Sequence, residues 1–232
     1  MELSAEDVTV RYGRVEALRG LRVTLHPGEK VLLLGPAGGG KTTLLKVLAG
    51  LLPPDGGRVR WDGDDVYRLP ASERKRLQAR LGMVFQTDAL FDSMSVLDNV
   101  LLPLLRRGVP RAEALPLAQE ALAAVGLSDA ASRNPEQLSG GMRKRAGLAR
   151  AVVARPQVLL ADDPFAGLDP ATSRQVASLL LSSSRGCTLV VCAPDPLPFL
   201  ALPRWLVVEE GQLRYDGPPR DTDAFPEPEV TA

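Results

Sequence analysis

The chain has 232 residues, of which 45% are hydrophobic, so it is long enough to bury one sizeable core. Its 28 Lys and Arg residues balance its 28 Asp and Glu residues, which excludes a long-range field that would gather nucleic acid or an anionic membrane. Cys187 and Cys192 are too few for a disulfide framework and are spaced poorly for a metal site, which favours a reducing cytosol. We see no basic and apolar leader, and the apolar runs are far shorter than the ~20 residues that cross a bilayer, so we expect a soluble chain.

The amino-terminal half of the sequence predicts a strand, a glycine-rich loop and a helix in that order. The alternation in "LRVTL" (21–25) and the apolar run "KVLLLG" (30–35) predict two strands joined by the turn "HPGE", and "KTTLLKVLAGLL" has the spacing of a helix. "GGRVRWDGDDVY" predicts a second hairpin with Asp62 and Gly63 at its turn. "RLGMVFQ" predicts a short buried strand.

The carboxy-terminal half of the sequence predicts a helical segment, then strands around a helix, and then a tail. From about residue 98 to residue 155 the sequence is rich in Ala and Leu and predicts an inserted helical lobe. The expected helix breaks are Pro103, Pro110, Pro116, Gly126 and Pro135. "QVLLADD" and "TLVVCA" then predict strands around the helical "PATSRQVASLLLSSS", which is the rhythm of a parallel sheet. "RWLVVEEGQLRYDG" predicts a closing hairpin, and the acidic, proline-rich residues 218–232 predict a mobile tail.

A glycine-rich motif, "GPAGGGKTT" (35–43), lies between the strand predicted at residues 30–35 and the helix that follows it, and matches the pattern G-x-x-x-x-G-K-[ST]. Glycines let backbone N–H groups turn toward phosphate oxygens, and the helix start adds partial positive charge. We expect Lys41 to reach the terminal phosphates and Thr42 to bind Mg²⁺. The alternative is a glycine-rich surface turn before an ordinary helix. The predicted phosphate-binding residues are Gly35, Pro36, Ala37, Gly38, Gly39, Gly40, Lys41, Thr42 and Thr43.

A second glycine motif, "LSGGMRKR" (138–145), precedes another predicted helix. The hydroxyl of Ser139 and the amides of Gly140 and Gly141 at a helix start would form a second anion site, far in sequence from Lys41. The alternative is an ordinary N-cap with glycines that only opens the helix. The apolar residues that define this helix are Met142, Ala146, Ala149 and Val153.

Together the two motifs resemble those of the ABC ATPase family, and the resemblance extends over residues 12–217. It implies a single ATPase domain over residues 1–217, of the α/β class. Within it the resemblance implies a P-loop NTPase (RecA-like) core with a mainly parallel sheet, an antiparallel β subdomain and a helical subdomain inserted at about residues 87–155. It also implies that MgATP is clamped head to tail between two copies, with Ser139 of one copy opposite Lys41 of the other. A heterodimer with another ATPase subunit is the alternative.

The same resemblance assigns roles to further residues. Tyr12 resembles the aromatic that stacks on adenine, and Gln86 resembles the glutamine that contacts Mg²⁺ and the attacking water. Asp162 resembles the carboxylate that holds Mg²⁺ through water, and Asp169 resembles the loop aspartate that crosses the dimer interface. Taken singly, Tyr12 could be a core residue and Gln86 or Asp169 a plain loop residue. The expected metal-binding residues are Thr42, Gln86 and Asp162, and the expected catalytic residues are Lys41, Gln86 and Asp163.

Two positions depart from the family pattern. Asp163 stands where the family usually has a glutamate that orients the attacking water, and its shorter side chain withdraws the carboxylate by about 1 Å, which can cost about 10²-fold in rate. Pro194 stands where the family usually has a histidine that hydrogen-bonds the γ-phosphate, and proline has neither a side-chain donor nor an N–H. His26, the single histidine, is expected in a solvated turn. We therefore expect intact MgATP binding with slow turnover.

The segment between Gln86 and the second motif predicts a membrane partner. Residues 87–137 suffice for a small helical lobe and are too short for the coiled coils of chromosome-maintenance relatives, which indicates a transporter. Phe91, Met94 and Val96 are candidate contacts to a permease, and the alternative is that they pack inside the helical lobe. We expect a cytoplasmic protein held at the inner face of the cell membrane by this permease.

A finer resemblance concerns the cargo. "LFDSMSVLDNVLLPL", with Met142 and Phe165, is similar to the ATPases of Mla-type phospholipid transporters, which implies a phospholipid cargo and an MCE lipid-binding partner. The alternatives are an importer of another small solute and a non-hydrolysing regulatory module that uses ATP to hold a dimer. A P-loop kinase fits less well, because the "LSGG" motif would then have no function. The basic clusters at residues 74–76 and 143–145 are interpreted as solvated helix faces, and no nucleic-acid partner is expected.

Overall fold

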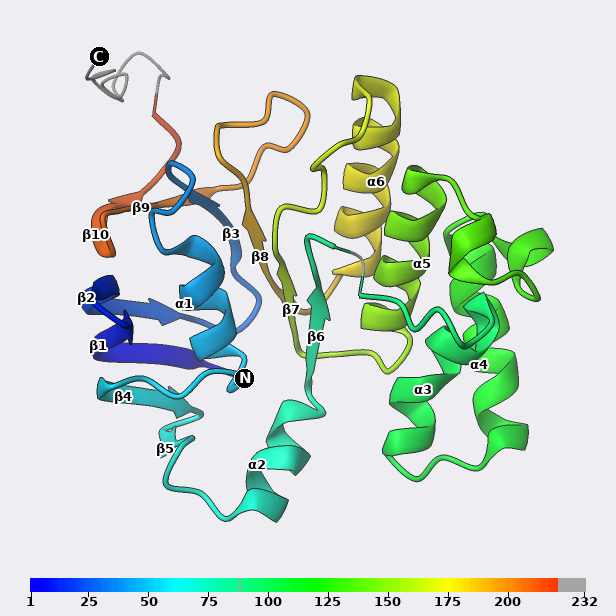
Figure 1. Cartoon of the computed structure of the whole chain (residues 1–232), viewed down its shortest axis with the longest axis horizontal. Helices are drawn as coiled ribbons and strands as arrows, with labels where there is room; N and C mark the ends of the chain where they lie inside the picture. The colour runs from blue at the N-terminus through cyan, green and yellow to red at the C-terminus, as the bar shows by residue number, and fades with distance from the viewer. Residues whose placement is uncertain (88, 221–232) are drawn as a thin grey trace.

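Two β-sheets with helices packed against them make up the described molecule (Figure 1). The structure is a computed structural model that describes residues 1–87 and 89–220. The predicted tail at 218–232 lies for the most part outside the described residues. Within them, no helix is both long enough and apolar enough to span a bilayer.

The larger sheet has the strand order β10-β9-β3-β8-β7-β6. Its strands are β3 (Lys30–Leu34), β6 (Leu81–Val84), β7 (Val158–Ala161), β8 (Thr188–Cys192), β9 (Arg204–Glu209) and β10 (Gln212–Gly217). Strands β9, β3, β8, β7 and β6 run parallel, and β10 pairs antiparallel with β9. Every residue of β7 and β8 is buried, because both faces of this sheet are covered and a continuous apolar run satisfies both.

The smaller sheet is antiparallel and has the order β2-β1-β4-β5. Its strands are β1 (Leu3–Tyr12), β2 (Val15–Leu25), β4 (Gly56–Trp61) and β5 (Asp64–Asp65). Asp62 and Gly63 form the predicted turn between β4 and β5 with φ of 49° and 91°. The sequence pattern did not predict β1, because irregular pairing between Ala5 and Val8, with Asp7 at φ 53°, interrupts its apolar alternation.

Six helices and two 3₁₀ turns connect the strands in the described residues. Their bounds are α1 (Lys41–Leu48), α2 (Ala71–Gln78), α3 (Val96–Arg106), α4 (Arg111–Ala124), α5 (Gly140–Val152) and α6 (Pro170–Ser183), with 3₁₀ turns η1 (Ser128–Ala130) and η2 (Pro135–Gln137). Helices α3, α4 and α5 lie between β6 and β7 in the chain and share a core that includes Val100, Leu104 and Leu122. The sequence did not predict α2, because none of its residues is buried and it has no apolar face.

Two predicted helix breaks are wrong. Pro103 lies inside α3 and Pro116 lies inside α4. A proline within a helix removes one backbone hydrogen bond, but most helix stability in a protein comes from packing of the apolar face. Buried Leu101 and Leu104 flank Pro103, and buried Ala114 and Ala118 flank Pro116, so packing holds both helices continuous.

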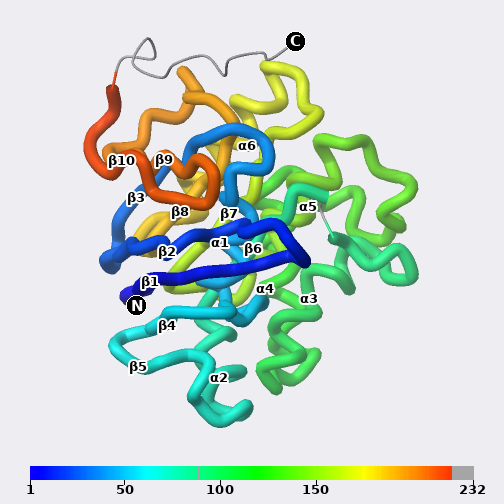
Figure 2. Tube along the Cα trace, turned by 60° about the vertical axis from the view of Figure 1, so that its left-hand side comes forward, coloured from blue at the N-terminus to red at the C-terminus, as the bar shows by residue number. Residues whose placement is uncertain are grey.

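Helix α1 lies between the two sheets, whereas α5 and α6 cover the opposite face of the larger sheet. One core cluster joins the smaller sheet to α1 and to one face of the larger sheet, through residues such as Leu45, Leu33 and Val190. A second cluster joins the other face to α5 and α6, through residues such as Leu148 and Val176. Figure 2 shows β1, β2 and β4 in front of α1. The sheet therefore separates the helix that follows the glycine-rich loop from the helix that follows Ser139.

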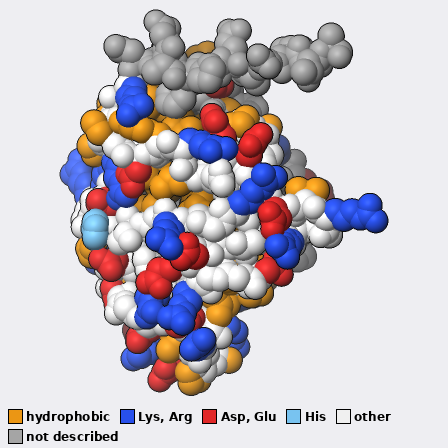
Figure 3. Space-filling view, turned by 90° about the vertical axis from the view of Figure 1, so that its left-hand side faces the viewer, with side chains coloured by type: hydrophobic (Ala, Val, Ile, Leu, Met, Phe, Trp, Pro, Cys, Tyr) orange, Lys and Arg blue, Asp and Glu red, His pale blue; other side chains and the backbone are white. Residues whose placement is uncertain are grey.

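Charges of both signs alternate over the face that carries the smaller sheet (Figure 3). Arg22 pairs with Asp7 at 2.5 Å, and Arg11 pairs with Glu16 at 2.6 Å. This mixed surface agrees with the neutral net charge and gives this face no field that would favour nucleic acid.

Candidate nucleotide-binding site

The glycine-rich loop connects the end of β3 to the start of α1. Gly35, Gly38 and Gly40 have φ of 139°, 76° and 109°, which residues with side chains rarely adopt. A Cβ atom at Gly35 would lie 2.0 Å from the carbonyl oxygen of Val208, so space also requires glycine there. Gly40 is the N-cap of α1, and the loop therefore lies at the partly positive end of a helix, where anions are stabilised.

Lys41 begins α1, and its ammonium lies against the loop. Its Nζ donates hydrogen bonds to the carbonyl oxygens of Gly35 at 2.5 Å and Pro36 at 2.8 Å. Burial lowers the pKa of Lys41, and the neighbouring Cys192 and Asp163 act against that shift. The loop thus holds a cation beside its backbone N–H groups, the combination that phosphate oxygens require.

Thr42 and Asp162 meet although 120 positions separate them in the sequence. The Thr42 hydroxyl donates to Asp162 Oδ1 at 2.9 Å. Asp162 follows β7 and is 5% exposed, and Thr42 follows the loop after β3. Because the carboxyl ends of parallel strands lie at one edge of the sheet, the two residues meet at that edge. Hydroxyl and carboxylate oxygens are the donors that Mg²⁺ prefers, so this pair fits that ion.

Asp163 and Gln86 also contact each other at this edge. The Gln86 side-chain amide donates to Asp163 Oδ2 at 3.3 Å. Burial, and then the adjacent Asp162, raise the pKa of Asp163, whereas Lys144, Lys41 and the Gln86 hydrogen bond lower it. Asp163 has φ of 43°, a left-handed conformation that Asp adopts more readily than most residues. The predicted catalytic residues Lys41, Gln86 and Asp163 are therefore brought together.

The predicted second anion site lies on the other side of the sheet. Ser139 is the N-cap of α5, where its hydroxyl accepts a hydrogen bond from the N–H of Met142 at 3.3 Å. Ser139 and Gly140 are exposed, while α5 and α1 cover opposite faces of the larger sheet. Ser139 and Lys41 of one chain thus belong to different surfaces, as a site completed by a second copy requires.

Asp169 and Tyr12 complete the set of predicted nucleotide contacts. Asp169 is the exposed N-cap of α6 and accepts hydrogen bonds from the N–H groups of Ala171 and Thr172, each at 3.0 Å. Tyr12 ends β1 and is 51% exposed, so its ring lies outside the hydrophobic core. Ala37 is exposed in the loop, whereas Thr43 is buried on the inner side of α1.

The two departures from the family pattern lie beside this site. Pro194 follows β8 closely, and its carbonyl oxygen accepts a hydrogen bond from the N–H of Gly35 at 3.4 Å. Pro194 therefore contacts the glycine-rich loop without supplying a side-chain donor. His26 is exposed, contacts Glu2 at 2.9 Å and lies at the opposite end of β3 from the loop, so it cannot replace that donor.

One buried charge near the site was missed by the sequence analysis. The interpretation of residues 143–145 as a solvated face is wrong for Lys144, which is 6% exposed and donates a hydrogen bond to the main-chain oxygen of Gln86. The signal was present in the spacing of Lys144, Leu148 and Ala151, all buried, which marks a second inward face on α5. The charge of Lys144 argued against placing it on a buried face, because charged residues are rarely buried.

A groove of about 790 Å³ opens between β6 and the inserted helices. Phe91 and Pro103 line it with the stems of Arg106 and Arg107. Phe91 is 45% exposed and Met94 is half-buried, so both stay candidate permease contacts. Val96 is fully buried in the helical core, so its prediction as a contact is wrong.

Comparison with known proteins gives the family. The model of the "ABC transporter" family matches residues 18–166. The chain is 43% identical over 219 residues to "Fe(3+) ions import ATP-binding protein FbpC" of Agrobacterium fabrum, covering 93% of this chain and 61% of that protein. It is 37% identical over 228 residues to "Methionine import ATP-binding protein MetN" of Mesorhizobium japonicum, covering 97% of this chain and 62% of that protein. The chain thus spans about three fifths of the length of these relatives.

Solved structures give the same answer for the fold. The dimeric ATP-binding cassette MJ0796, bound to ADP and Pi after hydrolysis, superposes with a TM-score of 0.84 at 29% identity, covering 94% of this chain and 99% of that one. A second dimeric structure of MJ0796, described as a bacterial ABC transporter cassette, has a TM-score of 0.85 at 30% identity, with the same coverage. The predicted P-loop NTPase fold is confirmed, whereas the resemblance to Mla-type phospholipid transporters is not supported by these relatives. The chain belongs to the ABC transporter family, as an ATP-binding domain.

Proposed function

We propose that this chain is the ATP-binding and ATP-hydrolysing subunit of an importer for a small solute, acting as a dimer on a membrane permease. The observation that carries the proposal is the meeting of Lys41, Thr42 and Asp162 beside the glycine-rich loop. This arrangement offers backbone donors and a cation to phosphates and oxygen donors to Mg²⁺.

Each residue at the loop has a separate task in this proposal. The loop amides and Lys41 hold the phosphates of ATP, and the Tyr12 ring stacks on adenine. Thr42, Asp162 and Gln86 would hold Mg²⁺, which when bound would offset negative charge on the phosphates. Asp163, oriented by Gln86, accepts a hydrogen bond from the attacking water. Turnover is slow because the Asp163 carboxylate is short and Pro194 offers no donor to the γ-phosphate.

The dimer follows from the separation of the two anion-binding motifs. We assign Ser139, Gly140 and Gly141 to the nucleotide bound by the loop of the other copy, with Asp169 at the interface between copies. The exposure of Ser139, Gly140 and Asp169 supports this assignment, because contact residues must be accessible in the single chain. Residues 1–217 act as one ATPase domain in this scheme, with residues 87–155 as the inserted helical subdomain.

The groove beside Phe91 supports a permease partner. Its wall joins β6, which leads to Gln86, to the inserted helix α3, so an inserted permease helix would contact both parts at once. Exposed apolar surface rimmed by Arg106 and Arg107 suits an amphipathic segment with acidic residues. Contact through this groove would place the chain at the cytoplasmic face of the membrane.

The cargo is proposed from the relatives alone. FbpC and MetN are named for import of iron(III) and of methionine, so we favour a small polar solute of this kind. Neither relative supports a phospholipid cargo or an MCE partner. Purification of the native membrane complex, with mass spectrometry of the attached permease, tests this choice: an MCE component would contradict it, and an importer permease would support it.

The shared nucleotide site can be tested by mixing two inactive variants. Lys41→Ala removes the cation at the loop, and Ser139→Asp preserves the helix cap of α5 while placing a negative charge where phosphate would lie. A mixed dimer contains one site with both wild-type residues if Ser139 acts on the partner's nucleotide. We expect each variant alone to be inactive and the mixture to regain ATPase activity, up to about half of the wild-type rate per dimer when mixed dimers are enriched.

The outcomes of this mixing distinguish the shared-site dimer from the non-hydrolysing regulatory alternative. Absence of regained activity from well-folded, dimerising variants would show that Ser139 does not serve the opposite copy. The regulatory reading, supported by Asp163 and Pro194, requires MgATP-dependent dimers in the wild type without any release of phosphate. Size-exclusion chromatography with light scattering, alongside phosphate release, distinguishes these results.

A further inference from the structure

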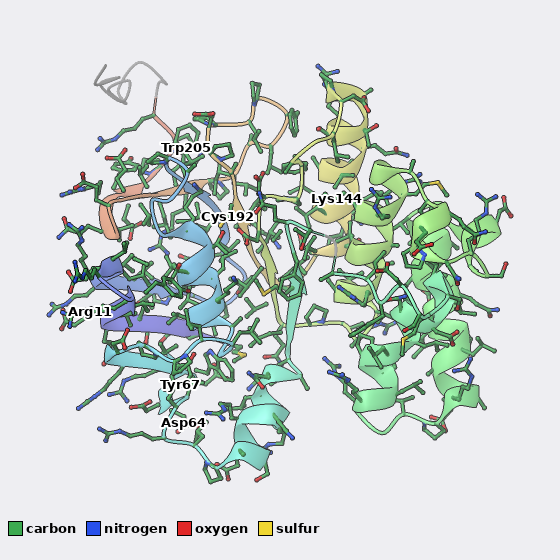
Figure 4. The ribbon with its side chains drawn as sticks, viewed as in Figure 1. Arg11, Asp64, Tyr67, Lys144, Cys192 and Trp205 are labelled. Atoms are coloured by element: carbon green, nitrogen blue, oxygen red, sulfur yellow. The ribbon has the colours of Figure 1, made fainter. Side chains whose placement is uncertain are left out.

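Helix α5 places a buried cation against the segment that carries Gln86. Lys144 lies on the side of α5 that faces the larger sheet (Figure 4). Only 6% of Lys144 is exposed, and its Nζ donates to the main-chain oxygen of Gln86. An ammonium is costly to bury without such partners, so the contact fixes its position. Gln86 is held here through its backbone, which leaves its side chain available to Asp163.

A second cation of α5 holds the same segment from further along the helix. Arg150 Nη1 donates to the carbonyl oxygen of Ala89 at 2.6 Å, and Ala89 has φ of 48°. The segment then reaches Phe91, whose N–H and carbonyl both bond the Asn99 side chain at 2.8 and 3.0 Å. Hydrogen bonds from ionised donors are roughly twice as strong as neutral ones. Helices α5 and α3 thus determine where the segment lies.

Gln86 connects Lys144 to Asp163. Its main-chain oxygen accepts the hydrogen bond from Lys144, and its side-chain amide donates to Asp163 Oδ2 at 3.3 Å. Lys144 therefore supports the pair Gln86 and Asp163 through the backbone of Gln86.

The start of α5 adds a reason for this arrangement. Ser139 caps α5, and Lys144 lies on the same helix little more than one turn later. A helix moves as a rigid element, so a shift of Ser139 on contact with a second copy would carry Lys144 with it. Gln86 would then move with the helix that meets the other nucleotide.

We propose that Lys144 is a positioning residue for the ATPase reaction, which ties the backbone of Gln86 to the helix that begins at Ser139. The proposal rests on the role of Gln86 proposed above. Lys144 touches neither ATP nor water in this scheme and acts only by orienting Gln86.

Three variants of the 232-residue chain test this role. Lys144→Met fills the same volume without a donor, Lys144→Arg keeps a cationic donor, and Arg58→Met removes an exposed cation from β4 as the matched control. We expect Lys144→Met to lower kcat about tenfold with little change in the KM for MgATP, because the phosphate-binding loop is untouched. Lys144→Arg should recover most of that loss, and Arg58→Met should match the wild type.

A double-mutant cycle with Gln86→Ala separates positioning from a general loss of stability. If Lys144 acts through Gln86, Lys144→Met costs little further activity once the Gln86 side chain is gone, so the effects are not additive. Hydrogen exchange over residues 83–91 gives a readout independent of turnover, and we expect faster exchange there in Lys144→Met alone.

The outcomes distinguish the two proposals. If Gln86→Ala leaves turnover unchanged, the role given to Gln86 fails first. If Gln86→Ala lowers turnover while Lys144→Met changes neither kcat nor exchange over residues 83–91, the role of Lys144 is refuted. Additive losses in the double variant also contradict it, because independent effects would mean that Lys144 does not act through Gln86.

Discussion

Gly141 at the start of α5 packs directly against Thr172 at the start of α6. A Cβ atom at Gly141 would lie 2.8 Å from Thr172 Cγ2, closer than side chains approach each other. The Thr172 hydroxyl in turn donates to Asp169 Oδ2 at 2.5 Å. The second glycine of "LSGG" therefore sets the distance between two helix starts that we assign to the dimer interface.

Substitution of Gly141 by Ala should cost stability in spite of the better helix propensity of Ala. We expect the free energy of unfolding to fall by about 1–3 kcal/mol, the usual cost of overpacking, because Thr172 is branched at Cβ and cannot turn its methyl away freely. Urea denaturation measures the change. Gly140→Ala is the matched control, because the nearest atom to a Cβ there lies 4.0 Å away.

A smaller side chain at position 172 should relieve this clash. Thr172→Ser removes Cγ2 but keeps the hydroxyl that bonds Asp169, so Gly141→Ala combined with Thr172→Ser should recover most of the lost stability. A double variant no more stable than Gly141→Ala alone would show that the contact with Thr172 does not cause the loss.

Replacement of Asp162 by Asn should weaken nucleotide binding only when Mg²⁺ is present. The amide keeps the size and an oxygen that Thr42 can bond, but removes the negative charge that favours a divalent cation. We expect the Kd for MgATP to rise at least tenfold, about 1.4 kcal/mol, with a much smaller change for ATP in excess EDTA. Isothermal titration calorimetry measures both values, and equal losses in the two conditions would argue against Asp162 as a metal-binding residue.

Asp163→Glu should raise kcat and slightly lower stability. The longer side chain extends the carboxylate by about 1 Å, and misplacement of that size can account for a rate difference of up to about 10²-fold. Glu is less suited than Asp to the left-handed φ of 43° at this position, so we expect a stability loss below about 1 kcal/mol. Phosphate release at saturating MgATP and thermal unfolding check both effects. Unchanged kcat would contradict the effect attributed to the short side chain of Asp163.

Neither cysteine should react with iodoacetamide in the native protein at neutral pH. Burial raises the pKa of the Cys187 thiol and raises that of Cys192 well above its usual range, so the reactive thiolate is scarce in both. Cys192 lies at the end of β8 (Figure 4), and both side chains are buried. Raising the pH from 7 to 9 should leave the native protein unlabelled while labelling the unfolded chain quickly. Mass spectrometry gives the extent, and rapid native labelling of Cys192 would show that this edge of the sheet opens.

Much of the arrangement around the glycine-rich loop could be predicted because its residues are close together in the sequence. Consecutive glycines, Lys41 and Thr42 occupy one loop between a strand and a helix, so spacing alone fixed their arrangement. The strands β3, β7 and β8 were equally predictable, since a sheet buried on both faces requires unbroken apolar runs. Asp162 could be placed because it ends one of these strands.

Other features depended on contacts between segments far apart in the chain. Strand β1 pairs through an irregular register, and α3 and α4 continue through Pro103 and Pro116 because packing outweighs one lost hydrogen bond. Val96 became a core residue once α3 met α4 and α5.

The sequence by itself determined the P-loop fold of this chain and predicted a second anion-binding motif, because those patterns are short and their chemistry is specific. Only the tertiary structure decided that Lys144 is buried against Gln86 and that Gly141 meets Thr172. The physical reason is that a helix surface acquires its inner faces from its neighbours, and α5 packs against the sheet as well as against other helices. A lysine that the sequence pattern places in solvent can then become a buried contact to Gln86.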